Sequence, residues 1–262
     1  MIRAFDLGGG GLKTCLFYYD GQTLHYVEDK IQLGICPDNV EISQWIRICL
    51  YENTGNKLDD EINLHYLFTF SLAGLYKLRE KPVNTEDISI LFDIPKVTCI
   101  DDGAAHLIGT LNTMKSLKAP IWNFALGTGL GFGFTDNGGK VRDFDDFWKL
   151  FECPPWSIID ERSNQEVWLA CSAKNGFDKI LQDDVFEEFA LRWKLFIQYI
   201  LQYCINDKQW GRPQSIVFTG GHIEFYGDRL IHNLLQFSLD VSIFSGPKNA
   251  GLLGAAWNCI QL

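Results

Sequence analysis

The sequence predicts an α/β protein of two similar lobes, each a mixed β-sheet flanked by helices, with a cleft between them. A pattern of three strands joined by two tight turns occurs twice, about 120 residues apart, and alternating strand-like and helix-like segments follow each copy. The composition agrees, because 47% hydrophobic and 21% charged residues in a chain of 262 can form large cores. We expect an N-terminal lobe over 1–107 and a C-terminal lobe over 108–262.

Each copy of the repeated pattern is marked by glycine-rich turns between runs of apolar residues. The turns lie at 8–11 and 20–21 in the first copy and at 127–131 and 137–139 in the second. Turns this short join antiparallel strands. The expected strands are 2–7, 12–19 and 23–27 in the first copy and 121–126, 132–135 and 140–144 in the second.

The segments outside the two copies alternate between helical and strand-like patterns. Short apolar runs predict further strands over 67–72, 97–100 and 215–218. Apolar residues spaced three or four apart predict helices over 41–52, 183–205 and 250–260. The last helix, about 250–262, is a candidate to pack back toward the first lobe.

The chain is strongly acidic, with 33 Asp and Glu against 23 Lys and Arg and a net charge of −10. Such a surface repels nucleic acids and anionic membranes, so neither is an expected partner, and a phosphate ligand would need backbone amides or a metal ion to hold it. No apolar segment is long enough to cross a membrane, and the chain opens directly on a strand, so we expect a cytoplasmic protein. Its oligomeric state stays open, a homodimer included.

Four consecutive glycines follow an aspartate at the end of the first strand. These glycines, which lack side chains, leave backbone N–H groups open to close approach by a phosphate. They are Gly8, Gly9, Gly10 and Gly11. Asp6, just before the turn, is placed to hold Mg²⁺ beside that phosphate, directly or through water. The alternative is a glycine-rich hairpin that only turns the chain.

A second glycine-rich loop stands at the matching place in the second copy, over 127–133. Thr128, between Gly127 and Gly129, adds a hydroxyl that can donate to a phosphate oxygen. A dinucleotide-binding fingerprint would need a helix after the loop, whereas a strand follows here. Two such loops in equivalent positions favour phosphate binding over simple turns.

Two adjacent acids end the strand at 97–100 and open a helix of small residues. A carboxylate held there, Asp101 or Asp102, can accept the proton of a substrate hydroxyl as that hydroxyl attacks a phosphorus atom. One of the two can instead cap the helix, since Asp is a favoured N-cap residue. His106, four residues later, is expected to be a packed or surface histidine rather than a catalyst.

The order of these segments resembles the actin-like fold of sugar kinases, and within it the ROK group, which includes glucokinases. Five of the group's motifs have counterparts that together span most of the chain. They are D-x-G-G-T-x-x-K at 6–13, N-D-A-N-A at 101–105, L-G-T-G-I-G-G-G at 126–133, I-V-x-G-G-G at 216–221 and A-G-x-x-G-A-A at 250–256. The resemblance implies two actin-like, ribonuclease H-like lobes with a nucleotide cleft between them.

The resemblance also implies a role for each matching residue. Asp102 would be the catalytic base, Asp101 a ligand of a sugar hydroxyl, and Asp6 the acid on the Mg²⁺ side. Gly220 and Gly221 would form part of the adenosine pocket. The phosphate contacts would be Gly8, Gly9, Gly10, Gly11, Lys13, Gly127, Thr128 and Gly129.

Several positions depart from the group's pattern. Gly10 replaces a Thr and Asp101 replaces an Asn, and the extra carboxylate is expected to raise the pKa of Asp102 or recruit a further cation. The E-x-G-H sugar motif is absent, although Glu152 and Glu166 lie roughly where sugar-binding glutamates would. The C-x-C-G-x-x-G-C zinc motif is absent too, and the eight cysteines include no C-x-C or C-x-x-C pair, so no zinc is expected.

Together these features predict an enzyme that uses ATP and Mg²⁺ to phosphorylate a hydroxyl of a small sugar, a hexose or an N-acetylated amino sugar. Two alternatives stay open. One is another small-molecule kinase of the same fold, resembling type II pantothenate kinase, which also lacks the zinc motif. The other is a catalytically weak nucleotide or sugar sensor that signals to a protein partner.

Overall fold

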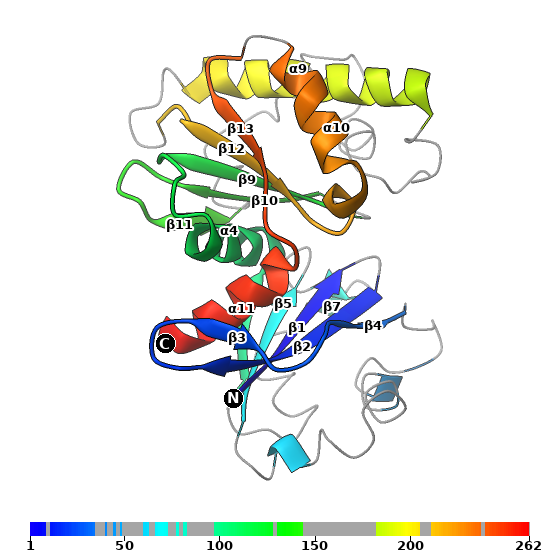
Figure 1. The fold of residues 1–262 in the computed structure, drawn as a ribbon, viewed down its shortest axis with the longest axis vertical. Coiled ribbons are helices and arrows are strands. Elements are labelled where there is room, and N and C mark those ends of the chain that lie inside the picture. The colour runs from blue at the N-terminus through cyan, green and yellow to red at the C-terminus, as the bar shows by residue number, and fades with distance from the viewer. Residues whose placement is uncertain are drawn as a thin grey trace. The chain divides into compact units, whose positions relative to one another are not determined.

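The structure is a computed structural model that describes residues 1–8, 11–34, 40, 44–45, 48, 60–62, 66–72, 77–78, 81–82, 97–127, 130–143, 182–204, 211–236 and 239–261. The chain divides into two compact units (Figure 1). Unit 1 comprises Met1–Gly109 together with Gly251–Leu262, and unit 2 comprises Thr110–Ala250.

Unit 1 is built on a mixed β-sheet. Its strands are β1 (Ile2–Gly8), β2 (Gly11–Tyr19), β3 (Leu24–Tyr26), β4 (Ile31–Leu33), β5 (Leu67–Leu72) and β8 (Val97–Asp101). Their order is β3-β2-β1-β5-β8, with β4 beside β2. β1 and β2 are antiparallel, whereas β1, β5 and β8 run parallel. A separate short hairpin pairs β6 (Lys77–Leu78) with β7 (Lys81–Pro82).

Unit 2 repeats the same plan. Its strands are β9 (Ile121–Leu126), β10 (Leu130–Thr135), β11 (Val141–Asp143), β12 (Ser215–Thr219) and β13 (Ser242–Ser245). Their order is β11-β10-β9-β12-β13, with β9 and β10 antiparallel and β9, β12 and β13 parallel. Strand for strand this matches β3-β2-β1-β5-β8, so the duplication predicted from the sequence is confirmed in the topology.

The parallel strands of each sheet end at one edge. In unit 1 Leu7 lies opposite Leu72, and Leu72 lies opposite Asp101. In unit 2 Ala125 lies opposite Thr219. The turn after β1 and the start of the helix after β8 therefore share an edge, as do the turns after β9 and β12. The carboxyl ends of parallel strands are the usual ligand-binding edge of α/β sheets.

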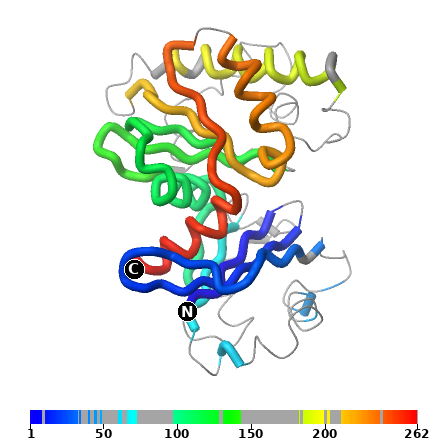
Figure 2. The backbone as a smooth tube through the Cα atoms, in the orientation of Figure 1, coloured from blue at the N-terminus to red at the C-terminus, as the bar shows by residue number. Residues whose placement is uncertain are grey.

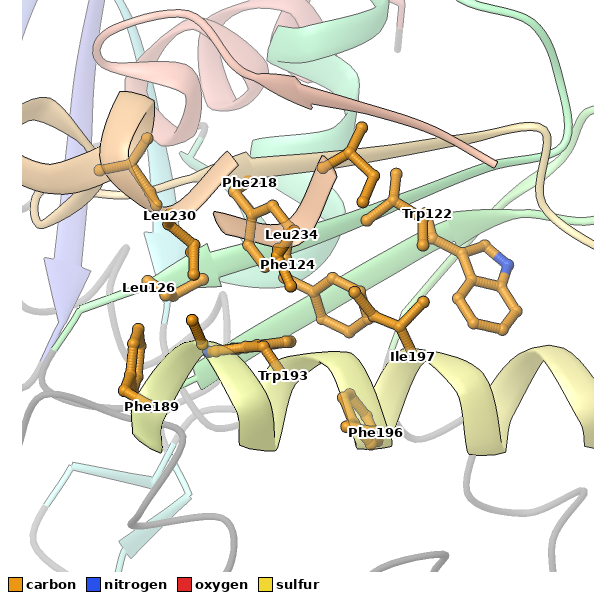
Figure 3. Packing of buried hydrophobic residues seen from close by; sticks show 14 of the residues in the cluster. Trp122, Phe124, Leu126, Phe189, Trp193, Phe196, Ile197, Phe218, Leu230 and Leu234 are labelled. Atoms are coloured by element: carbon orange, nitrogen blue, oxygen red, sulfur yellow. The ribbon is translucent and has the colours of Figure 1, made fainter. Parts of the chain in front are cut away.

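Two helices cover one face of the unit 2 sheet, α9 (Asp183–Cys204) and α10 (Ile223–Leu235). Aromatic rings fill the space between them and the strands: the ring centroid of Phe124 lies 5.0 Å from that of Trp193, and Trp193 lies 4.9 Å from Phe218 (Figure 3). Large buried rings contribute most of the apolar area of this core. The alternation of β9 places Trp122, Phe124 and Leu126 in this core and Asn123 on the opposite face.

The core of unit 1 draws on both ends of the chain. Helix α11 (Ala250–Gln261) buries Leu252 and Ala255 against Ile2, Ala4 and other residues of the first strands. Figure 2 shows this C-terminal segment, in red, beside the blue N-terminal strands. Small residues along α11 permit this close packing against the sheet.

A buried cation joins β1 to two distant segments of unit 1. The Arg3 side chain, 2% exposed, donates from Nε to Glu61 Oε2 at 2.9 Å, and its two terminal nitrogens pair with Glu61 and Glu28. Both carboxylates neutralise the charge that β1 brings into the interior.

Helix α4 (Asp102–Thr113) spans the boundary between the two units. Its residues up to Gly109 belong to unit 1, and those from Thr110 onward belong to unit 2. The helix follows β8 without an intervening loop, as the change from an apolar strand to small residues predicts.

Most expected elements are confirmed within a residue or two, including the long helix α9 and the closing helix α11. Sequence reasoning did not name α10, β13 or the short strands β4, β6 and β7. The predicted helix over 41–52 lies largely outside the described residues. Among the helices that the structure describes, none combines the length and apolarity needed to span a membrane.

Candidate functional site

The carboxylate of Asp6 and the ammonium of Lys13 meet at the edge of the unit 1 sheet. The two residues are directly opposite one another on β1 and β2, and Lys13 Nζ lies 3.4 Å from Asp6 Oδ2. The lysine keeps 26% of its side-chain surface exposed. The Lys13 ammonium lies beside the glycine turn that follows β1, and Asp6 is its carboxylate partner among the described residues. A partly exposed ammonium in this place suits an incoming phosphate.

Asp101 closes β8 and caps the helix that follows. Its Oδ1 accepts hydrogen bonds from the backbone N–H of Gly103 at 2.9 Å and of Ala104 at 3.4 Å. These amides are among those that a helix start leaves without intrahelical partners. The capping role that the sequence allowed for one of the two acids therefore falls to Asp101, and this fixes where α4 begins.

Asp102, the first residue of α4, has a carboxyl group that is hard to ionise. Its pKa is raised well above the usual range, mainly because the carboxyl is withdrawn from water, and further by the negative charges of Asp101 and Asp6. The charge effect expected from the sequence is present, but burial is the larger cause. A carboxylate with a raised pKa is a stronger base, which is the property required of a proton acceptor.

Helix α11 comes close to these acids at Gly251. A Cβ atom at this position would lie 2.9 Å from His106 Nε2 and 3.1 Å from Asp6 Oδ2, so only glycine fits without displacing one of them. His106 is buried, and burial lowers its pKa to about 4, which leaves the imidazole neutral at pH 7. Asp6, His106 and Gly251 therefore meet at one point of unit 1.

Sequence reasoning placed His106 as a packed or surface residue and did not connect it with Asp6. The sequence feature that could have placed His106 near the acids is its position four residues after Asp102, because residues four apart lie on one face of a helix.

In unit 2 the glycine turns after β9 and β12 touch through their backbones. Gly220 has φ +99°, and a Cβ there would lie 2.2 Å from the carbonyl oxygen of Leu126. The N–H of His222 donates to the same carbonyl at 3.4 Å. Gly127 follows Leu126 directly, and Gly221 follows Gly220. The structure thus joins the two glycine segments that the sequence predicted as phosphate and adenosine contacts.

Several predicted site residues lie outside the described residues. These are Gly9, Gly10, Thr128, Gly129, Glu152 and Glu166. Of the predicted site residues that the structure describes, Asp6, Gly8, Gly11, Lys13, Asp101 and Asp102 belong to unit 1, and Gly127, Gly220 and Gly221 belong to unit 2.

The acids of unit 1 fit a magnesium ion that arrives with phosphates. The Asp6 carboxylate packs against the backbone of Gly251 and keeps 11% of its side-chain surface exposed, beside Lys13. Within the described ranges, no three His, Cys, Asp or Glu side chains are grouped to hold a metal by themselves. Mg²⁺ commonly takes one or two carboxylates and completes its shell with phosphate oxygens and water.

Comparison with known proteins finds similarity in structure only. No protein-family model matches the sequence, and no curated protein matches it. An inorganic polyphosphate/ATP-glucomannokinase from Arthrobacter sp. strain KM has a TM-score of 0.66 and 17% identity, over 99% of this chain and 98% of that one. A ROK family glucokinase from Streptomyces griseus, solved with glucose and AMPPNP, has a TM-score of 0.64 and 13% identity, over 100% and 99%.

The same fold also occurs in a regulator. A ROK family transcriptional regulator, described as a homologue of the Escherichia coli MLC protein, has a TM-score of 0.57 and 12% identity, over 99% of this chain and 77% of that one. The order of strands and the near-complete coverage agree with the five motifs read from the sequence. This chain therefore has the two-lobed, actin-like fold of the ROK sugar kinases.

Proposed function

We propose that this protein transfers the γ-phosphoryl group of ATP to a hydroxyl of a small sugar, a hexose or an N-acetylated amino sugar. The observation that supports this most is the grouping of Asp6, Asp101 and Asp102 at the ligand-binding edge of a sheet whose fold is shared with sugar kinases. Acids at this edge serve phosphoryl transfer because they can take a proton and balance a metal ion.

Asp102 is the proton acceptor in this proposal. Phosphoryl transfer to an alcohol needs a group that takes the hydroxyl proton as the oxygen bonds to phosphorus. The raised pKa of Asp102 makes its carboxylate a stronger base than an ordinary aspartate, which favours proton transfer from the hydroxyl. The cap formed by Asp101 holds the first turn of α4, and so the backbone of Asp102, in a fixed orientation.

The other predicted residues divide between the sugar and the nucleotide. Asp101, Glu152 and Glu166 are proposed to bind sugar hydroxyls. Asp6 is proposed to hold Mg²⁺, which would neutralise charge on the phosphates when bound. The phosphate contacts are proposed to be Gly8, Gly9, Gly10, Gly11, Lys13, Gly127, Thr128 and Gly129, with Gly220 and Gly221 at the adenosine.

The test is ADP release from Mg²⁺-ATP across hexoses, N-acetylated amino sugars and pantothenate. Wild type is compared with Asp102→Asn and with the control Asp240→Asn. The Asp240 side chain is 89% exposed, and its described ion pair is with Arg212. The proposal expects turnover with at least one sugar, lost in Asp102→Asn and kept in Asp240→Asn. Turnover with pantothenate alone would assign the other kinase class.

A nucleotide or sugar sensor is the second candidate, and the regulator that shares this fold favours it. A sensor would bind AMPPNP or a sugar in calorimetry and yet release no ADP with any compound of the panel. The same set of measurements therefore separates the two candidates.

A further inference from the structure

A chain of buried hydrogen bonds crosses unit 2 from helix α4 to the end of strand β12. Thr110 Oγ1 donates to Asn123 Oδ1 at 3.1 Å, and Asn123 Nδ2 donates to Thr219 Oγ1 at 2.9 Å. The three side chains are at most 1% exposed. Thr219 Oγ1 in turn lies 3.5 Å from the carbonyl oxygen of Phe124, to which it can donate.

Asparagine is suited to the centre of this chain. Its carboxamide accepts at Oδ1 and donates at Nδ2 at the same time, whereas a carboxylate could only accept and an aliphatic side chain could do neither. Asn123 occupies the face of β9 opposite to the aromatic core formed by Trp122 and Phe124. A buried amide in a strand of otherwise apolar residues is costly unless both of its ends are bonded, as they are here.

The hydrogen-bond chain connects the elements that carry the proposed site. Thr219 directly precedes Gly220, and Asn123 lies on the strand that ends just before Gly127. Thr110 lies on α4, the continuous helix that starts at Asp102 about two turns earlier. An α-helix of this length transmits a shift at one end to the other because its backbone is stiffly hydrogen-bonded.

We infer that Asn123 is a positioning residue that couples the two glycine turns of unit 2 to the orientation of α4, and so to Asp102. The inference rests on the proposed function for its catalytic consequence, but the coupling between nucleotide and helix can be measured without turnover. In this reading, a nucleotide at Gly127 and Gly220 tightens the hydrogen-bond chain, and α4 becomes less free to move.

The experiment measures amide hydrogen exchange of residues 102–113 in the full chain, with and without Mg²⁺-AMPPNP. Thr110→Val and Thr219→Val remove one hydroxyl each with little change of shape. Asn123→Leu removes the carboxamide at the centre of the hydrogen-bond chain. Thr110→Ser and Thr219→Ser restore the hydroxyls. Thr135→Val is the matched control, because its buried hydroxyl accepts from Ile121 N at 2.8 Å at the opposite end of β9.

We expect Mg²⁺-AMPPNP to slow exchange of 102–113 about fivefold or more in wild type, the lower end of typical coupling between sites. The valine variants should lose this slowing and the serine variants should regain it. Thr110→Val should also lower kcat about fivefold or more while the KM for ATP changes less than about twofold, because it acts on the helix and not on the nucleotide. Thr135→Val should lose thermal stability and keep the slowing.

Other results would overturn the coupling. These are no slowing in wild type, slowing that persists in both valine variants, or loss of slowing in Thr135→Val as well, which would point to general loosening. Should Asn123→Leu fail to fold, the valine variants still decide. Coupling without turnover on any sugar would refute the proposed function alone, and turnover without coupling would refute this inference alone.

Discussion

Replacing Asp102 by asparagine should make the protein more stable and should slow phosphoryl transfer strongly. Wild type holds the Asp102 carboxyl where water is largely excluded and where Asp101 and Asp6 repel its charge. The neutral carboxamide of asparagine has nearly the same shape and none of this repulsion. A group placed for catalysis at the expense of folding free energy is a recurrent feature of active sites.

The sign of the stability change follows from the raised pKa. A carboxyl that binds its proton more tightly in the folded state contributes full stability below its unfolded pKa, and this contribution is lost as the pH rises through its folded pKa. Each pKa unit of the rise corresponds to about 1.4 kcal/mol of unfolding free energy at higher pH. In a protein of this size, each kcal/mol raises the melting temperature by about 2–4 °C.

The catalytic loss should be a factor of about 10² to 10⁴, as is usual when a general base is removed. Melting temperatures of wild type, Asp102→Asn and the exposed control Asp240→Asn are measured by calorimetry from pH 4 to 9, beside kcat from ADP release. The variant should match wild type at the acid end and exceed it increasingly as the pH rises. The kcat of wild type should fall on the acid side as Asp102 becomes protonated.

Two results would refute the reasoning. An Asp102→Asn variant that turns over within about threefold of wild type would show that Asp102 is not the base, since a lost base costs far more. A variant that melts well below wild type at pH 8 would show that the charged carboxylate is stabilised by its surroundings, contrary to the raised pKa.

Three further substitutions test other parts of the structure. Lys13→Met removes the cation beside Asp6 and should raise the KM for ATP about tenfold or more, with little change in the KM for the sugar. Steady-state kinetics measures both, and equal effects on the two KM values would contradict a phosphate contact. Gly220→Ala forces a Cβ against the Leu126 carbonyl at a position with positive φ. The variant should lose about 1–3 kcal/mol of unfolding free energy, measured by urea unfolding, and should bind AMPPNP more weakly. An unchanged urea midpoint would argue against this packing. Arg3→Leu leaves the buried Glu61 and the half-buried Glu28 without their cation and should cost about 3–5 kcal/mol of unfolding free energy near pH 7 in urea unfolding. A loss below about 1 kcal/mol would contradict an uncompensated charge.

The repeated strand pattern was predictable because it depends on local signals. Glycine turns and alternating apolar residues specify hairpins, and the hairpins β1-β2 and β9-β10 are formed as expected. Helix α10 was missed although Ile223, Leu230 and Leu234 have helical spacing, because the helix contains Gly227 and glycine is a poor helix former. Strand β13 is only four residues long, and a run that short is not distinctive in sequence.

The site was predictable where motifs mark it and not where tertiary contacts make it. Asp6, Asp101 and Asp102 could be predicted because each ends an apolar strand beside a glycine-rich or small-residue turn. The approach of Gly251 to Asp6 and His106 depends on a helix that is more than 140 residues away in sequence from the histidine, and no local pattern encodes it. Nothing in the sequence marks Thr110, Asn123 and Thr219, because Thr and Asn are common residue types. Only the distances between their side chains reveal the hydrogen bonds that connect them.

The contribution of α11 to unit 1 has a consequence for how the protein folds during synthesis. Unit 2 is one continuous segment, so all of its residues are synthesised before residues 251–261 of α11. Unit 1 cannot complete its core until Leu252 and Ala255 emerge, although its first strands are synthesised earliest. Completion of the first unit therefore waits for the synthesis of α11, in contrast to the usual N-terminal-first order, and its apolar strands stay exposed to aggregation until then.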